Sequence, residues 1–238
     1  MSDATKNEQP VLLEGRKVSS GYGPIKVIRD IDIEVRRGEV VAVIGPNGAG
    51  KTTTLLTLAG ELTPSEGEIH FLGAPTTDPM HIRCRKGLGF VTEERSVIMD
   101  LSAADNLRLA NVSADVATTL FPELRRLLNR KAGLLSGGEQ QMLTLARTLG
   151  RDPKVILADE LSLGLAPLIV SRLLEALKVA AVERGLGVVL VEQHVRQALK
   201  IADRVYVMQR GRVVLSGPAT EIAGRLSEIE AAYLSSAV

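Results

Sequence analysis

One eight-residue segment constrains the fold of this chain more than any other. Residues 45–52 read Gly-Pro-Asn-Gly-Ala-Gly-Lys-Thr and match the pattern G-x-x-x-x-G-K-[ST]. The segment follows an apolar stretch at residues 39–44 and opens a helical pattern at residues 50–59. A strand, a glycine-rich turn and a helix in this order form the phosphate loop of α/β nucleotide-binding domains. We therefore expect an α/β fold with an anion site at the end of a buried strand.

The residue types of this loop suit a polyphosphate. Gly45, Gly48 and Gly50 allow successive backbone N–H groups to converge on a phosphate, and the following helix N-terminus adds partial positive charge. Lys51 supplies a full charge to the β- and γ-oxygens, and the Thr52 hydroxyl is a magnesium ligand. ATP with Mg²⁺ is the predicted ligand. Its predicted binding residues in this loop are Gly45, Pro46, Asn47, Gly48, Ala49, Gly50, Lys51, Thr52 and Thr53.

Two adjacent carboxylates follow a second apolar strand. Residues 155–158 are Val-Ile-Leu-Ala, and Asp159 and Glu160 come directly after them. The carboxyl end of a parallel strand beside a phosphate loop is where an open α/β sheet binds its ligand. Asp159 is the predicted magnesium ligand, and Glu160 is the predicted general base for a water that attacks the γ-phosphate.

Composition excludes several other classes of protein. The 238 residues carry 29 Lys and Arg against 28 Asp and Glu, and they include three Phe, three Tyr and no Trp. A net charge of +1 and so few aromatic side chains argue against a nucleic-acid partner. A single cysteine, Cys84, excludes an intramolecular disulfide.

The apolar runs are too short to cross a membrane, which needs roughly 18 residues. Residues 1–10 are polar and lack the apolar core of a signal peptide. We read residues 1–10 as a flexible tail and expect a cytoplasmic protein.

Hydrophobic patterning orders the rest of the chain. It predicts strands at residues 11–18, 30–35, 39–44, 68–71, 88–91, 155–158, 188–191, 204–209 and 212–216, and helices at 50–59, 139–149, 169–183 and 195–202. Short turns at residues 37–38 and 65–67 favour an antiparallel arrangement of the early strands, and the helices between the later strands favour a parallel sheet. We expect a single domain over residues 11–238, with a helical insert over approximately 93–150.

A serine-glycine segment supplies the decisive likeness. Residues 135–141 read Leu-Ser-Gly-Gly-Glu-Gln-Gln, and Ser136 with two glycines caps a helix expected to begin near Glu139. With this segment the chain resembles the ATP-binding subunits of ABC transporters, in which it is the signature motif, from Val11 to Leu234. The resemblance implies an α/β fold with a P-loop NTPase core, an antiparallel β subdomain and a helical insert.

The resemblance also implies roles for single residues. Tyr22 matches the aromatic that stacks on adenine, and His194 matches the switch histidine at the γ-phosphate. Ser136, Gly137 and Gly138 would act in trans on the nucleotide of a second subunit. Glu93 stands where the family usually has Gln, and we expect it to join Thr52 and Asp159 as a metal ligand. Catalysis is assigned to Glu160 and His194.

Finer matches point to one branch of the family. Residues 162–167, 191–193 and 197–204 resemble the smaller ATPase subunit of branched-chain, or hydrophobic, amino-acid importers. Importers of urea or short amides share much of this pattern, and the ATPase of a lipid or polysaccharide exporter is the further alternative. The insert between Leu101 and Leu135 is shorter than is usual for the branch.

The implied partners are transmembrane permease subunits, a second ABC ATPase subunit and, indirectly, a periplasmic or extracellular solute-binding protein. The chain would then lie on the cytoplasmic face of the inner or plasma membrane, held there by the permease. Two other classes of protein fit the sequence less well. The neutral charge disfavours a nucleic-acid-binding ABC ATPase of DNA repair or translation, and Glu160 and His194 disfavour a non-hydrolysing nucleotide-binding module.

Overall fold

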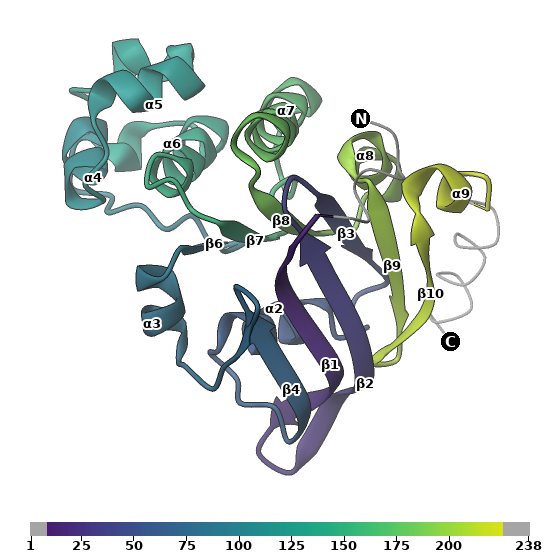
Figure 1. Cartoon of the computed structure of the whole chain (residues 1–238). Helices are drawn as coiled ribbons and strands as arrows, with labels where there is room; N and C mark the ends of the chain where they lie inside the picture. The colour runs from purple at the N-terminus through teal and green to yellow at the C-terminus, as the bar shows by residue number, and fades with distance from the viewer. Residues whose placement is uncertain (1–8, 226–238) are drawn as a thin grey trace.

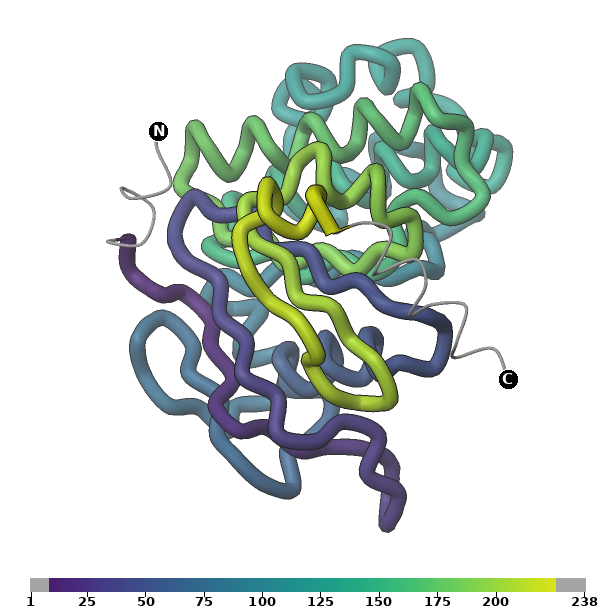
Figure 2. The backbone as a smooth tube through the Cα atoms, turned by 90° about the vertical axis from the view of Figure 1, so that its right-hand side faces the viewer, coloured from purple at the N-terminus to yellow at the C-terminus, as the bar shows by residue number. Residues whose placement is uncertain are grey.

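The computed structural model describes residues 9–225, which form two sheets covered by helices (Figure 1). Most of the predicted tail 1–10, and residues 226–238 of the predicted domain, lie outside this range. The antiparallel sheet lies on one side and the helices α4, α5, α6 and α7 on the other, as a view turned by 90° also shows (Figure 2).

The first sheet is antiparallel and has the strand order β2-β1-β4-β5. Its strands are β1 (Val11–Tyr22), β2 (Ile25–Arg36), β4 (Glu66–Phe71) and β5 (Ala74–Pro75). A tight turn with Gly23 at φ +56° joins β1 to β2, so that Tyr22 pairs with Ile25. The predicted antiparallel β subdomain is confirmed, with longer strands than the sequence pattern indicated.

The second sheet has the strand order β10-β9-β3-β8-β7-β6. Its strands are β3 (Val40–Ile44), β6 (Leu88–Val91), β7 (Val155–Asp159), β8 (Gly187–Glu192), β9 (Arg204–Gln209) and β10 (Arg212–Pro218). The first five of these strands run parallel to one another, and β10 runs antiparallel to β9. Every residue of β3, β7 and β8 is buried, as expected for parallel strands covered on both faces.

Two expectations about strand pairing are wrong. The turn at residues 37–38 does not join an antiparallel pair, because β2 and β3 belong to different sheets. β3 instead pairs with β8 and β9 in the middle of the second sheet, and its two faces are covered by different buried clusters. At the other end, β10 pairs antiparallel with β9 because only the tight turn at Arg210 and Gly211 separates them, too few residues for a crossover.

The helix that follows the phosphate loop lies between the two sheets. This helix, α2 (Lys51–Ala59), packs Leu55, Leu58 and Ala59 into one buried cluster with side chains from β1 and β2 and from β3, β7 and β8. Alternate residues of β3 face opposite ways, and Val41 and Val43 point to this cluster. The phosphate loop is therefore anchored at both ends in the core.

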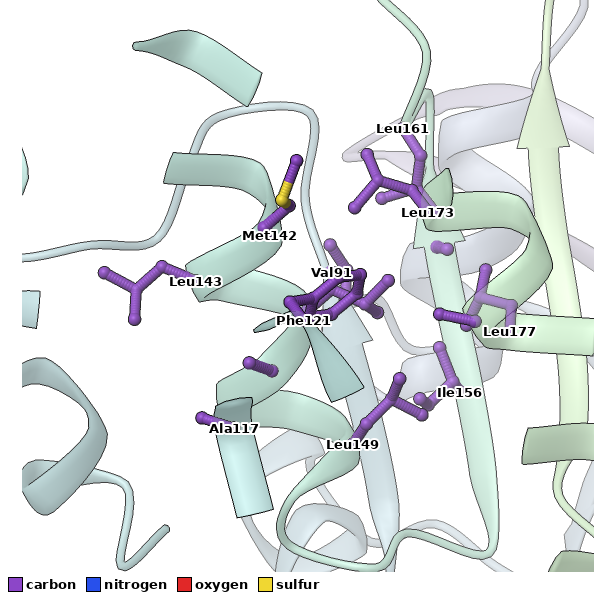
Figure 3. Packing of buried hydrophobic residues seen from close by; sticks show 14 of the residues in the cluster. Val91, Ala117, Phe121, Met142, Leu143, Leu149, Ile156, Leu161, Leu173 and Leu177 are labelled. Carbon is purple, nitrogen blue, oxygen red and sulfur yellow. The ribbon is translucent and has the colours of Figure 1, made fainter. Parts of the chain in front are cut away.

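A second buried cluster covers the other face of the parallel sheet. It joins β6, β7 and β8 to α5 (Ala114–Leu120), α6 (Gly137–Leu149) and α7 (Pro167–Arg184). Figure 3 shows part of it, with Val91 of β6, Ile156 of β7 and Leu177 of α7 among the labelled side chains. Phe121, just after α5, is fully buried among these elements. Because the helices after β6 share this core with the sheet, they are held firmly against the strand ends that carry the site.

The remaining helices are short. They are α3 (Met80–Arg85), α4 (Ala103–Leu109), α8 (Val195–Ile201) and α9 (Ala219–Ala223), with 3₁₀ turns at Pro122–Leu127 and Ala132–Leu134. Between residues 9 and 225, no helix combines the length and apolar character that a membrane span requires. The predicted insert 93–150 corresponds to the chain between β6 and β7, and its status as a separate unit stays a prediction.

A partly buried ion network ties the two sheets together. The Arg204 guanidinium on β9 donates to both carboxylate oxygens of Glu39, at 2.9 Å each, and to Glu34 Oε1 on β2 at 2.8 Å. Bidentate pairing of this kind fixes orientation as well as distance. It holds β2 of the antiparallel sheet against β9 of the parallel sheet, close to where β3 begins.

Candidate nucleotide site

A cavity of about 530 Å³ opens at the carboxyl ends of the parallel strands. The phosphate loop forms one wall, and the loops after β6, β7 and β8 supply the others. Its lining comprises Val27, Asn47, Gly48, Gly50, Lys51, Thr52, Thr53, Glu93, Glu160, Leu163 and Gln193. The structure thus brings together the predicted phosphate loop, the predicted base Glu160 and two of the three predicted metal ligands, Thr52 and Glu93, from segments far apart in the sequence.

Two glycines of the loop have no room for a side chain. A Cβ atom on Gly45 would lie 2.4 Å from the carbonyl oxygen of Met208 on β9. At Gly50, which caps the start of α2, φ is +99° and a Cβ would lie 2.7 Å from Ile28 Cγ2. Glycine is the residue that tolerates both close approach and positive φ. The curl of the loop therefore depends on strands β2 and β9 as well as on its own sequence.

Lys51 lies inside the curl of the loop. Its side chain is 5% exposed, and Nζ donates to the carbonyl oxygens of Gly45 at 2.9 Å and Pro46 at 3.2 Å. Burial lowers the pKa of Lys51, and the nearby carboxylates of Glu160 and Asp159 oppose this shift. A buried cation whose hydrogen bonds go to neutral carbonyls is a strong attractor for a phosphate oxygen, which offers a full negative charge.

Glu160 adopts a backbone conformation that is rare for its residue type. Its φ is +47°, in the left-handed region that disfavours side chains. The carboxylate Oε2 accepts a 2.7 Å hydrogen bond from Gln193 Nε2, and Oε1 lies 4.0 Å from Lys51 Nζ. Backbone strain of this kind persists where neighbouring contacts enforce it, and such positions cluster at functional sites.

Asp159 provides the observation that bears on a metal ion. The residue is 5% exposed, and its Oδ1 atom is buried with no hydrogen-bond partner. Burial raises the pKa of Asp159, while a hydrogen bond from the Thr52 hydroxyl opposes the shift. An unpartnered buried carboxylate oxygen beside a hydroxyl is the kind of oxygen pair that Mg²⁺ accepts. Thr52, Asp159 and the cavity-lining Glu93 therefore fit this ion.

These oxygen ligands do not form a closed metal cage. Within residues 9–225, no three side chains of His, Cys, Asp or Glu come close enough together to hold a metal ion on their own. Mg²⁺ usually keeps several waters and completes its shell with substrate phosphates, so a partial set of protein ligands suits it.

The signature segment forms the start of α6. The helix begins at Gly137, two residues before the predicted start near Glu139, because Ser136 and Glu139 form a reciprocal capping box. Ser136 N donates to Glu139 Oε2 at 2.8 Å, and Glu139 N donates to Ser136 Oγ at 3.4 Å. The segment does not line the cavity of its own chain, as expected if it serves another nucleotide.

Both signature glycines have close neighbours that the sequence did not reveal. A Cβ on Gly137 would lie 2.6 Å from a guanidinium nitrogen of Arg95, and a Cβ on Gly138 would lie 2.9 Å from Ile169 Cγ2. Arg95 Nη1 also lies 3.4 Å from Gln140 Oε1 on α6. Arg95 thus connects the loop that carries Glu93 to the start of the signature helix.

Besides the signature residues, six predicted site residues do not line the cavity, namely Gly45, Pro46, Ala49, Asp159, Tyr22 and His194. Tyr22 ends β1 with half of its surface exposed, and His194 is exposed at the start of α8. Neither is among the lining residues, so their roles stay predictions. Gln193 and Leu163 line the cavity, although the sequence assigned neither of them a role in binding or catalysis. The one sequence signal for Gln193 is its position next to His194. The contact between Gln193 and Glu160 depends on how β7 and β8 pair, which the sequence does not show.

Comparison with known proteins decides the family. A family model described as ABC transporter matches residues 28–162, which is more than half of the chain. The high-affinity branched-chain amino acid transport ATP-binding protein BraG of Pseudomonas aeruginosa is 41% identical over 214 residues, or 86% of this chain and 91% of BraG. The chain belongs to the ABC transporter family. It is an ATP-binding subunit, and ATP hydrolysis is its activity.

Two further likenesses bear on the wider assignment. The lipopolysaccharide export system ATP-binding protein LptB of Acidithiobacillus ferridurans is 36% identical over 225 residues, or 89% of this chain and 92% of LptB. The dimeric structure of the bacterial ABC transporter cassette MJ0796 superposes with a TM-score of 0.77 at 26% identity, covering 87% of this chain and 99% of that cassette. ABC ATPase subunits dimerise and work with transmembrane permeases.

Proposed function

We propose that this ABC ATPase energises an importer for branched-chain or other hydrophobic amino acids. The observation that carries the proposal is the 41% identity to BraG, which spans nearly all of both chains. The branch-like segments 162–167 and 191–193 support it further, and one residue of each, Leu163 and Gln193, lines the cavity. A solute-binding protein outside the membrane would deliver the amino acid, and the chain would lie on the cytoplasmic side.

In the proposed site, each residue has one task. Lys51 and the loop N–H groups bind the β- and γ-phosphates of ATP, and Glu160 accepts the proton of the attacking water. Thr52, Asp159 and Glu93 would hold Mg²⁺, which would supply positive charge to neutralise the phosphates. His194 contacts the γ-phosphate, and Tyr22 stacks on the adenine.

The proposed working unit is a head-to-tail dimer. Ser136, Gly137 and Gly138 of one subunit then face the phosphate loop of the other, and closure on ATP would be transmitted to the permease. The segment lies at the N-terminus of a helix of 13 residues, whose dipole is favourable for the partner's phosphates. In this branch we propose a heterodimer with a related, larger ATPase.

The proposed permease contact is a basic cleft of about 620 Å³ between α3, β6 and α6. Its lining includes Arg85, Lys86, Arg147, Arg151 and Lys154. Arg147 Nε is buried there without a hydrogen-bond partner. We propose that a cytoplasmic segment of the permease with acidic side chains fills this cleft, because such a segment would neutralise the clustered cations.

Uptake of labelled leucine, isoleucine and valine tests the import proposal. Deletion of the gene for this chain is expected to abolish high-affinity uptake, and the wild-type gene but not Lys51→Ala is expected to restore it. Arg151→Glu is expected to lose co-purification with the permease while the isolated chain still binds ATP. Unchanged amino-acid uptake in the deletion strain would refute import.

Lipopolysaccharide export is the second candidate, on the strength of the 36% identity to LptB. The same deletion strain separates the two. Export predicts intact amino-acid uptake together with a loss of lipopolysaccharide from the outer surface, measured by surface labelling.

A further inference from the structure

A buried carboxylate beside the site has no part in the assignments above. Glu192 is the last residue of β8 and is fully buried, although β8 lies in the middle of the parallel sheet where charged groups are costly. A carboxylate in such a position persists only where its oxygens are well hydrogen-bonded. The identity of its partners therefore decides what it does.

Both oxygens of Glu192 are taken up by one residue of the loop after β7. Ser162 donates its backbone N–H to Oε1 at 3.1 Å and its hydroxyl to Oε2 at 2.5 Å. Ser162 is itself 6% exposed, so water does not compete for either bond. Charge-assisted hydrogen bonds in a dry environment are the strong ones. The pair thus pins Ser162 to the end of β8.

Ser162 lies two residues after Glu160, and the chain between them is held by further contacts from β8. Glu160 N donates to Val191 O at 3.0 Å, and Gln193 donates to Glu160 Oε2 at 2.7 Å. The consecutive residues 191–193 therefore hold both Glu160 and Ser162 in place through hydrogen bonds. These hydrogen bonds support the left-handed backbone at Glu160, a conformation that persists only where neighbouring contacts enforce it.

We propose that Glu192 is a positioning residue: by accepting both hydrogen bonds from Ser162, it fixes the loop after β7 so that Glu160 is aimed into the phosphate cavity. The inference rests on the assignment of Glu160 as the general base. Burial, reinforced by the nearby Glu160 and Asp159, raises the pKa of Glu192 to about 7, and the Ser162 hydrogen bonds oppose the shift. A buried acid with a raised pKa costs folding free energy at neutral pH, so packing alone does not account for the Glu192–Ser162 pair.

The test measures ATP hydrolysis and ATP binding by the full chain at saturating and limiting ATP. Ser162→Ala removes the hydroxyl and keeps the backbone bond, and Glu192→Ala removes both contacts. Because aiming the base acts on the chemical step, both variants are expected to lower kcat at least about tenfold while KM changes less than about twofold. Glu192→Gln, which can still accept from the Ser162 N–H, is expected to recover most of the rate.

A double variant separates positioning from general damage. Combined with Glu160→Gln, Ser162→Ala is expected to add no further loss, because there is no base left to aim. The control is Ser19→Ala, which removes another buried serine hydroxyl, the acceptor of Asp30 N–H on the antiparallel sheet, and should leave kcat unchanged. Thermal unfolding checks that each variant is folded.

Three results would overturn the proposal: wild-type kcat in folded Ser162→Ala and Glu192→Ala, a loss that falls on KM, or full additivity with Glu160→Gln. A failed assignment of the base gives a different result, since Glu160→Gln alone would then hydrolyse ATP at close to the wild-type rate.

Discussion

The Nζ atom of Lys51 lies 4.0 Å from the Oε1 atom of Glu160, within the cavity that both residues line. The cation that is proposed to receive the γ-phosphate thus already faces the carboxylate that is proposed to activate water. A phosphate bound by Lys51 would lie beside Glu160 without any large movement of either side chain. Substitution of Lys51 and of Glu160 tests the two proposed roles separately.

Lys51→Ala is expected to weaken ATP binding by roughly 10- to 150-fold, since a hydrogen bond to a charged group contributes about 1.5–3 kcal/mol. Titration calorimetry with ATP measures the change. Lys86→Ala, which removes an exposed lysine paired with Asp78, is the matched control and should bind ATP normally. Wild-type affinity in Lys51→Ala would contradict the assigned phosphate site.

Glu160→Gln is expected to bind ATP with near wild-type affinity and to hydrolyse it roughly 10² to 10⁴ times more slowly, because a positioned base contributes about that much. The trapped ATP should hold the dimer closed, which size-exclusion chromatography with ATP and Mg²⁺ detects. Glu94→Gln changes an exposed carboxylate on a neighbouring loop and serves as control. Rapid hydrolysis by Glu160→Gln would remove it from the role of base.

Glu93→Gln is expected to raise the Mg²⁺ concentration needed for half-maximal hydrolysis in the assembled transporter. The carboxylate is a better magnesium ligand than an amide oxygen, but without the metal it repels the γ-phosphate. Binding of ATP in the absence of Mg²⁺ should therefore be equal or tighter in the variant. An unchanged Mg²⁺ requirement with lost coupling to the permease would make Glu93 a mechanical contact instead.

Glu192 is expected to make the free energy of unfolding fall as the pH rises. Its pKa in the folded chain is about 7, above the ordinary 4.5, so the neutral form favours folding. The contribution is complete below about pH 4.5 and is lost as pH rises through 7, on the order of 1–3 kcal/mol. Glu192→Gln should flatten this part of the profile, as measured by urea unfolding at pH 5 and pH 8. Parallel profiles for the two proteins would contradict it.

Local sequence predicted those parts of the site that depend on nearby residues. The curl of the phosphate loop requires glycines at fixed spacing before Lys51, and Asp159 and Glu160 follow an unmistakable buried strand, so both could be found in the chain itself. The helix start at Gly137 was missed by two residues because two glycines are poor helix formers, and the capping box of Ser136 and Glu139 outweighed their low propensity.

Contacts between segments far apart could not be predicted in this way. The bonds from Glu192 to Ser162 and from Gln193 to Glu160 depend on the parallel register in which Asp159 pairs with Val191. A shift of one residue in that register would turn these side chains to the other face. The placement of Arg95 against Gly137 likewise depends on how the loop after β6 folds onto α6.

The contact between Gly45 and the Met208 carbonyl has a consequence for protein engineering. The shape of the phosphate loop depends on a backbone atom 163 positions downstream. Residues 45–52 therefore cannot be moved to another protein as an independent unit. Grafting these residues onto another scaffold would transfer the motif's sequence without its backbone conformation, unless the host also has a strand as close to the loop as β9 is to Gly45. Conversely, insertions between β9 and β10 should disturb nucleotide affinity from the opposite end of the chain.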